Sequence, residues 1–357
     1  MQMWTFFMAG CKYSPRPVGR PAVRFLSLQS GFLMALLLAG TAATACAAQT
    51  PNQAPKPTGA MVDLGGHKLH VHCAGTGAPT VIIENGFQEY SFDWILVQQE
   101  VAKFTRVCTY DRAGYAWSDP GPKPRTFAQI NLELHDALEK LGEHGPFVLV
   151  GHSFGGPVAR NFALRYPKHV AGMVFAEGVS EDQRIPINNK AVLLREGGGK
   201  KTIPEPREEM RSSDMPGPPT RGAEQASNSV DPPFDRLPAN FQALHLWADK
   251  QPAMEDAINS ESSWSPEYFA RWHSRPQQGT LGNIPLIVLT SANAGYGNDL
   301  DISGAQLEAD RKEIQAQMAL LSSNGKQKIV QAGHNLQVED PAVVVQAIRD
   351  VVMAARK

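Results

Sequence analysis

A serine between two glycines, in Gly151-His152-Ser153-Phe154-Gly155, is the pattern in this chain with the clearest chemical meaning. A serine hydroxyl is a weak nucleophile unless a base removes its proton, and a sharp strand-to-helix turn can present it to that base. An apolar run over 147–150 precedes the pentapeptide, and a helix-compatible stretch over 157–166 follows it. The alternative is a glycine-rich turn without chemistry. The strand-turn-helix context favours a catalytic Ser153.

A histidine near the C-terminus offers the base that this serine needs. His334 follows Gly333 directly after the apolar run 328–330, and Pro341 opens a helical pattern shortly afterwards. Imidazole can take and return a proton near neutral pH, which suits general-base work. A surface loop histidine is the alternative, but the glycine-histidine pair at a strand end favours a role in catalysis.

Four segments together resemble the α/β-hydrolase fold family, and are most similar to its cap-bearing bacterial esterases and lipase-like enzymes. They are 81–87 (Val-Ile-Ile-Glu-Asn-Gly-Phe), 107–118 (Val-Cys-Thr-Tyr-Asp-Arg-Ala-Gly-Tyr-Ala-Trp-Ser), the Ser153 pentapeptide and Gly333-His334. The resemblance implies a mostly parallel eight-stranded sheet with helices on both faces and an inserted, mainly helical cap. It also implies a triad in the chain order serine, acid, histidine.

Periodicity along the chain agrees with this α/β fold class. Patterns of period two predict a hairpin over 61–64 and 68–73 and strands near 80–84, 106–110, 147–150, 170–176, 285–290 and 326–330. Helical spacing of apolar residues predicts helices over 126–141 and 341–355. Alternation of strands and helices is typical of a parallel sheet covered on both faces.

The triad acid has two candidate positions, because the family places it after either the sixth or the seventh strand. Glu177 directly follows the apolar run 170–176, and a rigid strand end suits a carboxylate that must orient an imidazole. Asp299 and Asp301 come late after the strand expected over 284–290. Glu177 is therefore the preferred acid, and Asp299 and Asp301 are the alternatives. A purely structural role for Glu177 is also open.

The resemblance further implies two backbone donors for an oxyanion. These are the N–H group of Phe87 and that of Phe154, the residue after the nucleophile. The family usually carries His-Gly where this chain has Asn85-Gly86, a departure that leaves the backbone donor intact.

The predicted reaction is hydrolysis of a small or medium carboxylic ester through an acyl-enzyme, as in carboxylesterases of class EC 3.1. Its partners are the ester and water, and neither a cofactor nor a metal is predicted. The alternatives are related aminopeptidase, lactonase or haloperoxidase chemistry, and a catalytically silent ligand-binding protein of the same fold.

The N-terminal segment, residues 1–48, is predicted to be a signal peptide. Basic residues without acidic ones precede the apolar run 31–39, and small residues follow it. A membrane anchor is the competing interpretation, but the apolar run of roughly a dozen residues is short of the ~20 that span a bilayer. Cys46 leaves lipid anchoring as a minor alternative. The expected location is periplasmic or secreted, with membrane contact only through an uncleaved leader or a lipid anchor.

The remaining chain divides into a core over 49–178 and 281–357 and a predicted cap over 179–280. The cap segment interrupts the strand-helix alternation, is rich in proline, glycine and charge over 197–240, and becomes aromatic and helical over 241–247 and 263–272. The whole chain of 357 residues has 34 basic and 35 acidic residues and 42% hydrophobic residues. This balance suits a globular enzyme and argues against a nucleic-acid partner.

Cysteines and clustered histidines give two further expectations. Cys73 and Cys108 fall on strands that are neighbours in the resembling fold, so both a disulfide and a pair of buried thiols are open. His67, His70 and His72 lie in the first hairpin without a carboxylate or cysteine to complete a metal site, and we expect them on an exposed polar face.

Overall fold

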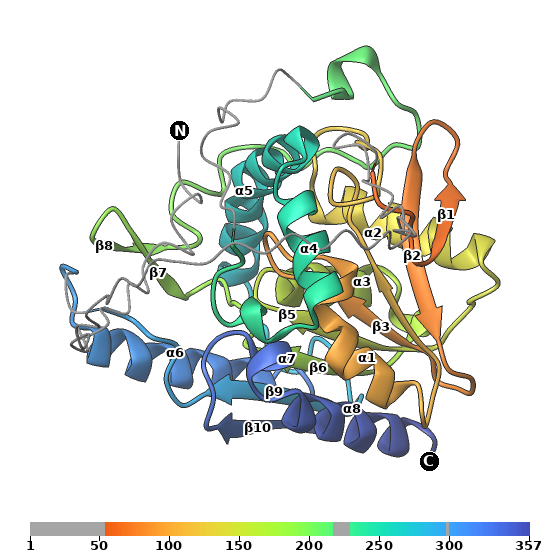
Figure 1. Cartoon of the computed structure of the whole chain (residues 1–357). Helices are drawn as coiled ribbons and strands as arrows, with labels where there is room; N and C mark the ends of the chain where they lie inside the picture. The colour runs from red at the N-terminus through yellow and green to blue at the C-terminus, as the bar shows by residue number, and fades with distance from the viewer. Residues whose placement is uncertain (1–53, 217–228, 298–299) are drawn as a thin grey trace, which may run out of the picture.

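The computed structural model describes residues 54–216, 229–297 and 300–357 of the chain. An eight-stranded sheet in the order β1-β2-β4-β3-β5-β6-β9-β10 forms its centre (Figure 1). The pairings of β2 with β1 and with β4 are antiparallel, and the other pairings in this sheet are parallel. The strands are β1 (Ala60–Asp63), β2 (Lys68–Ala74), β3 (Val81–Glu84), β4 (Val107–Tyr110), β5 (Phe147–His152), β6 (Val170–Ala176), β9 (Leu286–Ser291) and β10 (Gly325–Val330).

Helices cover both faces of the sheet, which explains why its central strands β3, β5 and β6 are buried and mainly apolar. Val81 and Ile83 belong to a core that they share with α1 and α8, while Ile82 between them belongs to a second core with α2 and α3. Successive side chains of a strand point to opposite faces, so one short strand supplies both cores. The helices around the sheet are α1 (Ile95–Val101), α2 (Phe127–Lys140), α3 (Gly155–Arg165), α6 (Gly304–Ala319), α7 (Leu336–Glu339) and α8 (Pro341–Ala355). The predicted fold class is confirmed.

A long insertion, residues 179–280, separates β6 from β9. Its described part holds a hairpin of β7 (Arg184–Ile187) and β8 (Lys190–Leu193) and the helices α4 (Ala239–Ala248) and α5 (Pro252–His273). The two aromatic stretches that predict helices lie within α4 and α5. In Figure 1 these two helices lie above β5 and β6.

The expectation of an exposed polar face in the first hairpin is wrong for two of its histidines. His67 and His70 are buried, at 4% and 0% exposure. His70 Nδ1 lies 2.8 Å from Asp111 Oδ2, and its Nε2 accepts the Gly59 N–H at 3.0 Å. The ring of Trp117 lies 4.6 Å from that of His70, so a segment distant in sequence covers this face of β2.

Cys73 and Cys108 stand opposite each other in the β2–β4 register and form a disulfide. The choice between a bridge and two free thiols is thus decided in favour of the bridge.

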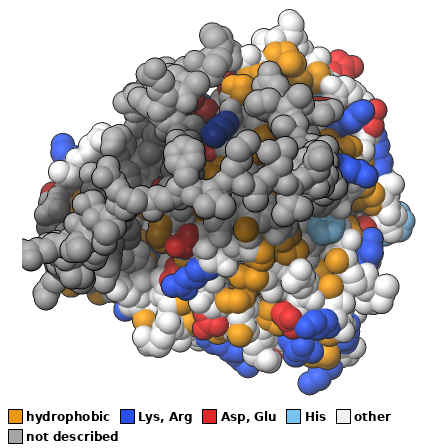
Figure 2. Space-filling model, viewed as in Figure 1, with side chains coloured by type: hydrophobic (Ala, Val, Ile, Leu, Met, Phe, Trp, Pro, Cys, Tyr) orange, Lys and Arg blue, Asp and Glu red, His pale blue; other side chains and the backbone are white. Residues whose placement is uncertain are grey.

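The visible surface carries charges of both signs. Figure 2 shows Lys and Arg side chains interspersed with Asp and Glu over the described part of this face, in keeping with the near-neutral composition. Among the helices in the described ranges, none combines the length and the apolar character needed to cross a bilayer. The predicted leader, residues 1–48, lies outside the described residues.

Candidate active site

Ser153 occupies the tight turn between β5 and α3, with a positive φ of 49°. Few non-glycine residues hold this conformation, and such strain clusters at functional sites. The flanking glycines provide space: a Cβ on Gly151 would lie 2.6 Å from the Gly155 carbonyl oxygen, and one on Gly155 would lie 2.2 Å from the Glu84 carbonyl oxygen. The two glycines therefore allow a sharp turn that passes close to the end of β3.

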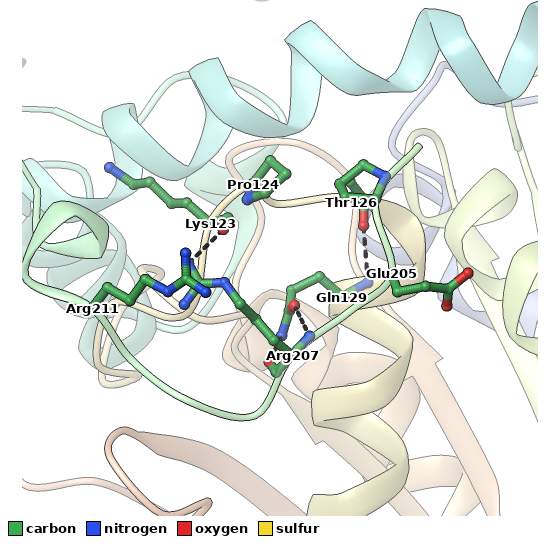
Figure 3. A pocket seen from close by; sticks show the side chains of 8 residues that line it. Lys123, Pro124, Thr126, Gln129, Glu205, Arg207 and Arg211 are labelled. Carbon is green, nitrogen blue, oxygen red and sulfur yellow. Dashed lines mark hydrogen bonds between the residues drawn. The ribbon is translucent and has the colours of Figure 1, made fainter. Parts of the chain in front are cut away.

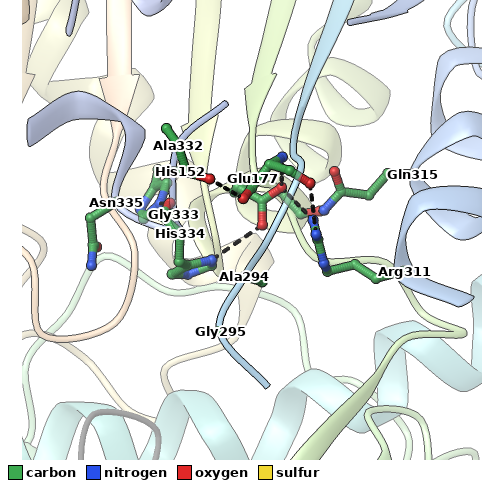
Figure 4. Close-up of polar contacts among 12 residues, drawn as sticks. His152, Glu177, Ala294, Gly295, Arg311, Gln315, Ala332, Gly333, His334 and Asn335 are labelled. Atoms are coloured by element: carbon green, nitrogen blue, oxygen red, sulfur yellow. Dashed lines mark hydrogen bonds and ion pairs between the residues drawn. The ribbon is translucent and has the colours of Figure 1, made fainter. Parts of the chain in front are cut away.

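Glu177 and His334 meet at the carboxyl ends of β6 and β10. His334 Nδ1 lies 3.4 Å from Glu177 Oε2 (Figure 4). The backbone carbonyl of His334 lies 2.9 Å from His152 Nε2, so the histidine loop rests against the residue that precedes Ser153. The structure thus brings together three segments that are far apart in sequence.

Partners besides the histidine fix the carboxylate of Glu177. Its Oε1 accepts hydrogen bonds from the Ser291 N–H and from Arg311 Nη1, both at 2.6 Å. Arg311 is held in turn by Glu308 and by the Ser291 carbonyl. Burial raises the pKa of Glu177, but the hydrogen bond with His334 and the charge of Arg311 outweigh it, so this pKa lies below its ordinary value. Glu177 is ionised at neutral pH.

The structure does not bring Asp301 to His334. Asp301 Oδ1 accepts the Ala191 N–H at 2.8 Å, and the Asp301 N–H donates to the Asn189 carbonyl, so this residue fastens the β7–β8 hairpin. Asp299 lies outside the described residues. Glu177 is thus the candidate acid that the structure places against the histidine.

The loop after β3, residues 85–87, is held from two sides. The Gly86 N–H donates to Glu89 Oε2 at 2.7 Å, while Arg112 donates to the Asn85 carbonyl at 2.6 Å and to the Gly86 carbonyl at 2.9 Å. Because Glu89 occupies the Gly86 N–H, that group is not available to a substrate oxygen.

Phe87 and Phe154, the two predicted oxyanion donors, lie side by side. Their rings stack with centroids 3.7 Å apart, which places the loop after β3 against the start of α3. Phe154 also belongs to a buried cluster with Phe127 of α2 and with side chains of the insertion. The members that α5 contributes are Tyr268, Phe269 and Trp272.

Arg112 connects the loop after β3 to the insertion. Its Nε donates to Glu261 Oε1 on α5 at 3.1 Å, and the Tyr115 hydroxyl donates to Glu261 Oε2 at 2.8 Å. Arg112 and Glu261 are both 1% exposed, which makes this a buried link between the core and α5. A displacement of α5 would therefore change the support of the loop carbonyls.

Groups that could hold a metal ion lie away from these contacts. In the described part of the chain, one such group is Cys73, Cys108 and Glu143, whose two sulfurs are already joined in the disulfide. The other is His135, Glu139 and His169, on α2 and on the short helix η2 (Pro167–His169). Neither group includes a residue of the predicted triad.

A cavity of about 300 Å³ lies beside the first turn of α2 (Figure 3). Two of its cationic side chains are already paired: Lys123 Nζ lies 2.5 Å from Asp256, and Arg207 donates to Asp214 at 2.6 Å. The cavity is lined by Lys123, Pro124, Thr126, Gln129, Pro204, Glu205, Arg207 and Arg211. It contains no residue of the predicted triad.

Two partners of the site are not predicted by the sequence. Arg311 lies within the charged stretch of α6, where nothing in the local pattern separates it from its neighbour Lys312. Glu89 comes three residues after Gly86. Its position in the segment that follows β3 is the only feature of the local sequence that could indicate a role in the site.

Comparison with known proteins defines the class to which this fold belongs. Residues 79–341 match the sequence profile of the family described as alpha/beta hydrolase fold. The chain therefore belongs to the α/β-hydrolase fold family.

Its similarity to individual known proteins covers only part of each chain. Epoxide hydrolase 3 of Mus musculus is 33% identical over 140 residues, which cover 38% of this chain and 38% of that protein. An AB hydrolase superfamily protein of Gibberella zeae is 36% identical over 107 residues, covering 29% of this chain and 33% of that protein. The chain thus matches less than two fifths of the length of these relatives.

Solved structures match over a greater length. An esterase from Thermogutta terrifontis has a TM-score of 0.55 at 20% identity, and the match covers 82% of this chain and 95% of the esterase. A serine hydrolase involved in carbazole degradation has a TM-score of 0.53 at 15% identity, and the match covers 83% of this chain and 98% of that hydrolase. At these identities the likeness shows the fold alone.

Proposed function

We propose that this hydrolase-fold protein cleaves carboxylic esters of small or medium size with Ser153 as the nucleophile. The observation that carries the proposal is the contact between Glu177 and His334 beside a strained elbow that presents a serine. A serine at the elbow argues against epoxide-hydrolase chemistry, which in similar folds needs an aspartate nucleophile. Two of the matched structures, those of an esterase and of a serine hydrolase, agree with this proposal.

The proposed mechanism is acyl transfer to water. His334 takes the proton of Ser153 as the hydroxyl attacks the ester carbonyl, and Glu177 fixes the imidazole and stabilises its protonated form. The backbone N–H groups of Phe87 and Phe154 hold the oxyanion. Engagement of the Gly86 N–H by Glu89 supports Phe87 as the donor from this loop. The ester C–O bond then breaks as His334 gives its proton to the departing alcohol, which leaves the acyl-enzyme. Water, activated by the neutral His334, attacks this acyl-enzyme, and the carboxylic acid leaves as His334 returns a proton to Ser153.

We also propose that the insertion acts as a cap over this site. Its aromatic side chains on α5 belong to the same buried cluster as Phe154, the residue next to the nucleophile, and their rings contact Phe127, which in turn contacts Phe154. They are therefore placed to exclude water and to shape an acyl pocket. The proposed export of the chain agrees with the Cys73–Cys108 disulfide, because such bonds persist in oxidising compartments.

The test is hydrolysis of p-nitrophenyl acetate, butyrate and octanoate by the chain beginning near Gln49, together with labelling by a fluorophosphonate. We expect turnover of at least one ester and a single labelled peptide that contains Ser153, because the probe reacts with an activated serine. The relative rates would rank the acyl lengths that the site accepts. Folded protein that neither hydrolyses these esters nor takes the label would contradict the proposal and favour a ligand-binding role.

A further inference from the structure

Glu89 carries a buried carboxylate that has no role in the proposed mechanism. It is 2% exposed, and its Oε2 accepts the Gly86 N–H at 2.7 Å. Its Oε1 lies 2.5 Å from His152 Nδ1 and accepts a hydrogen bond from Gln337 Nε2 at 3.2 Å. A buried carboxylate is costly unless it is paired and hydrogen-bonded, and here three partners surround it.

The partner of Glu89, His152, is fully buried and faces an oxygen on each side of its ring. Nδ1 faces Glu89 in a charge contact that is not an aligned hydrogen bond, and Nε2 lies 2.9 Å from the His334 carbonyl oxygen. Neither oxygen can donate, so the ring satisfies both only when both nitrogens carry a proton. Burial lowers the pKa of His152, but the charge of Glu89 outweighs it and leaves this pKa raised. His152 is therefore a buried cation paired with a buried anion.

This ion pair lies where three parts of the proposed site meet. Glu89 holds the residue before the oxyanion donor Phe87, while His152 precedes Ser153 and holds the backbone of His334. A buried ion pair is weak evidence for stability in itself, because apolar replacements are often as stable. Its position between Ser153, His334 and the loop over residues 85–87 favours a role in aligning these parts of the site.

We propose that Glu89 and His152 form a positioning pair. The pair keeps the loop after β3, residues 85–87, and His334 aligned with Ser153. This inference rests on the proposed function and adds two residues to it. Neither side chain has to touch the substrate, because the effect passes through the Gly86 N–H and the His334 carbonyl. Displacements of about 1 Å in such a site can cost a factor of about 100 in rate.

The test compares Glu89→Ala and Glu89→Gln with the wild type on the best p-nitrophenyl ester. We expect kcat to fall about 100-fold in Glu89→Ala with KM near its wild-type value, because alignment acts on the transition state. Glu89→Gln should retain more of kcat, since its amide oxygen can still accept the Gly86 N–H while its amide group donates to a neutral His152. It also keeps the shape of the side chain should Glu89→Ala fail to fold.

The matched control is Glu133→Gln. Glu133 is 4% exposed and pairs with the buried Arg125, so it resembles Glu89 in burial and pairing. We expect this control to lower the unfolding temperature and to leave kcat unchanged. Wild-type kcat in both Glu89 variants, or an equal loss in Glu133→Gln, would overturn the positioning role alone. Absence of Ser153-dependent turnover in the wild type would overturn the proposed function and this role with it.

A second inference comes from an independent cluster of side chains on α2 and η2. His135 and Glu139 are one turn apart on α2, and with His169 they offer ligand atoms within 4.8 Å of one another. His144 Nδ1 lies 2.9 Å from Glu139 Oε2, so a third imidazole is within reach. The Nδ1 atom of His169 is buried and has no hydrogen-bond partner among the described residues.

The geometry points to a binding site for a divalent transition metal such as Zn²⁺. Imidazole nitrogens and a carboxylate are ligands that Zn²⁺ takes at about 2.0–2.2 Å, often with four ligands in a tetrahedron. Atoms bound in this way are separated by about 3.5 Å, so the ligands must close by a small rotation of their side chains. His144 has a side chain that is 67% exposed, so solvent leaves it room for such a rotation.

The test is calorimetric titration of the folded chain with ZnCl₂ in a buffer that does not bind the metal. We expect one bound ion per chain and an affinity lower by about tenfold or more in His169→Ala. The control is His273→Ala, an exposed histidine that pairs with Asp182 at 2.7 Å. No binding by the wild type, or equal binding by wild type and His169→Ala, would overturn this site.

Discussion

Ester turnover should fall by about a million-fold in kcat when Ser153 is replaced by alanine, and fluorophosphonate labelling should disappear. The reason is that the variant removes the atom that forms the acyl-enzyme while the oxyanion donors and the pocket stay in place. Alanine adds no atom that serine lacks, so it fits the space that the flanking glycines leave at this turn. The measurement is the initial rate of p-nitrophenol release under saturating ester, beside gel detection of the label.

The control for this experiment is Ser322→Ala. Ser322 is 3% exposed, and its hydroxyl donates to the Ile284 carbonyl at 2.6 Å before the amino end of β9, whereas the proposed site lies at the carboxyl ends of the strands. We expect this variant to lose some stability and to keep its turnover and its label. Residual turnover in Ser153→Ala close to the wild-type rate, in a preparation free of other esterases, would show that another residue carries the reaction.

The order of elements can be predicted because it rests on local patterns. The helices expected over 126–141 and 341–355 agree with α2 (Phe127–Lys140) and α8 (Pro341–Ala355), and the strands expected over 147–150 and 170–176 agree with β5 and β6. These segments carry strong periodicity that is bounded by turn residues. The β7–β8 hairpin is not predicted, because it lies in an insertion whose short strands pair with each other and not with the main sheet.

The site can be predicted only as far as its residues carry motifs. Ser153 lies in a pentapeptide with its own geometry, and Glu177 is indicated by its position at a strand end. Arg311 and Glu89 carry no motif, and their partners stand 134 and 63 residues away in sequence, at Glu177 and His152. Their roles follow from burial, since each charge is out of water and must be paired. Burial of this kind depends on the tertiary fold and not on the local sequence.

Replacing Glu177 by glutamine should reduce kcat by about 10⁴-fold, although the new side chain has almost the same shape. The reason lies in the partners of the carboxylate. Ser291 N–H and Arg311 both donate to Oε1, so the amide oxygen of the glutamine must take that place. Its NH₂ group then faces Nδ1 of His334 and donates to it. The proton of the neutral imidazole is thereby moved to Nε2, where the ring can no longer accept the proton of Ser153.

The alternative acid supplies the matched control for this change. Asp301→Asn also converts a carboxylate to an amide, but its oxygen can still accept the Ala191 N–H, so we expect turnover near that of the wild type. Glu177→Gln should in addition lower the unfolding temperature, since the buried Arg311 loses one of its two carboxylates and retains Glu308. The measurements are kcat, KM and thermal unfolding for both variants. A loss of kcat in Asp301→Asn at unchanged KM, with an active Glu177→Gln, would contradict Glu177 as the acid and favour the loop after β9 as its source, because that pattern reports an interaction made only in the transition state.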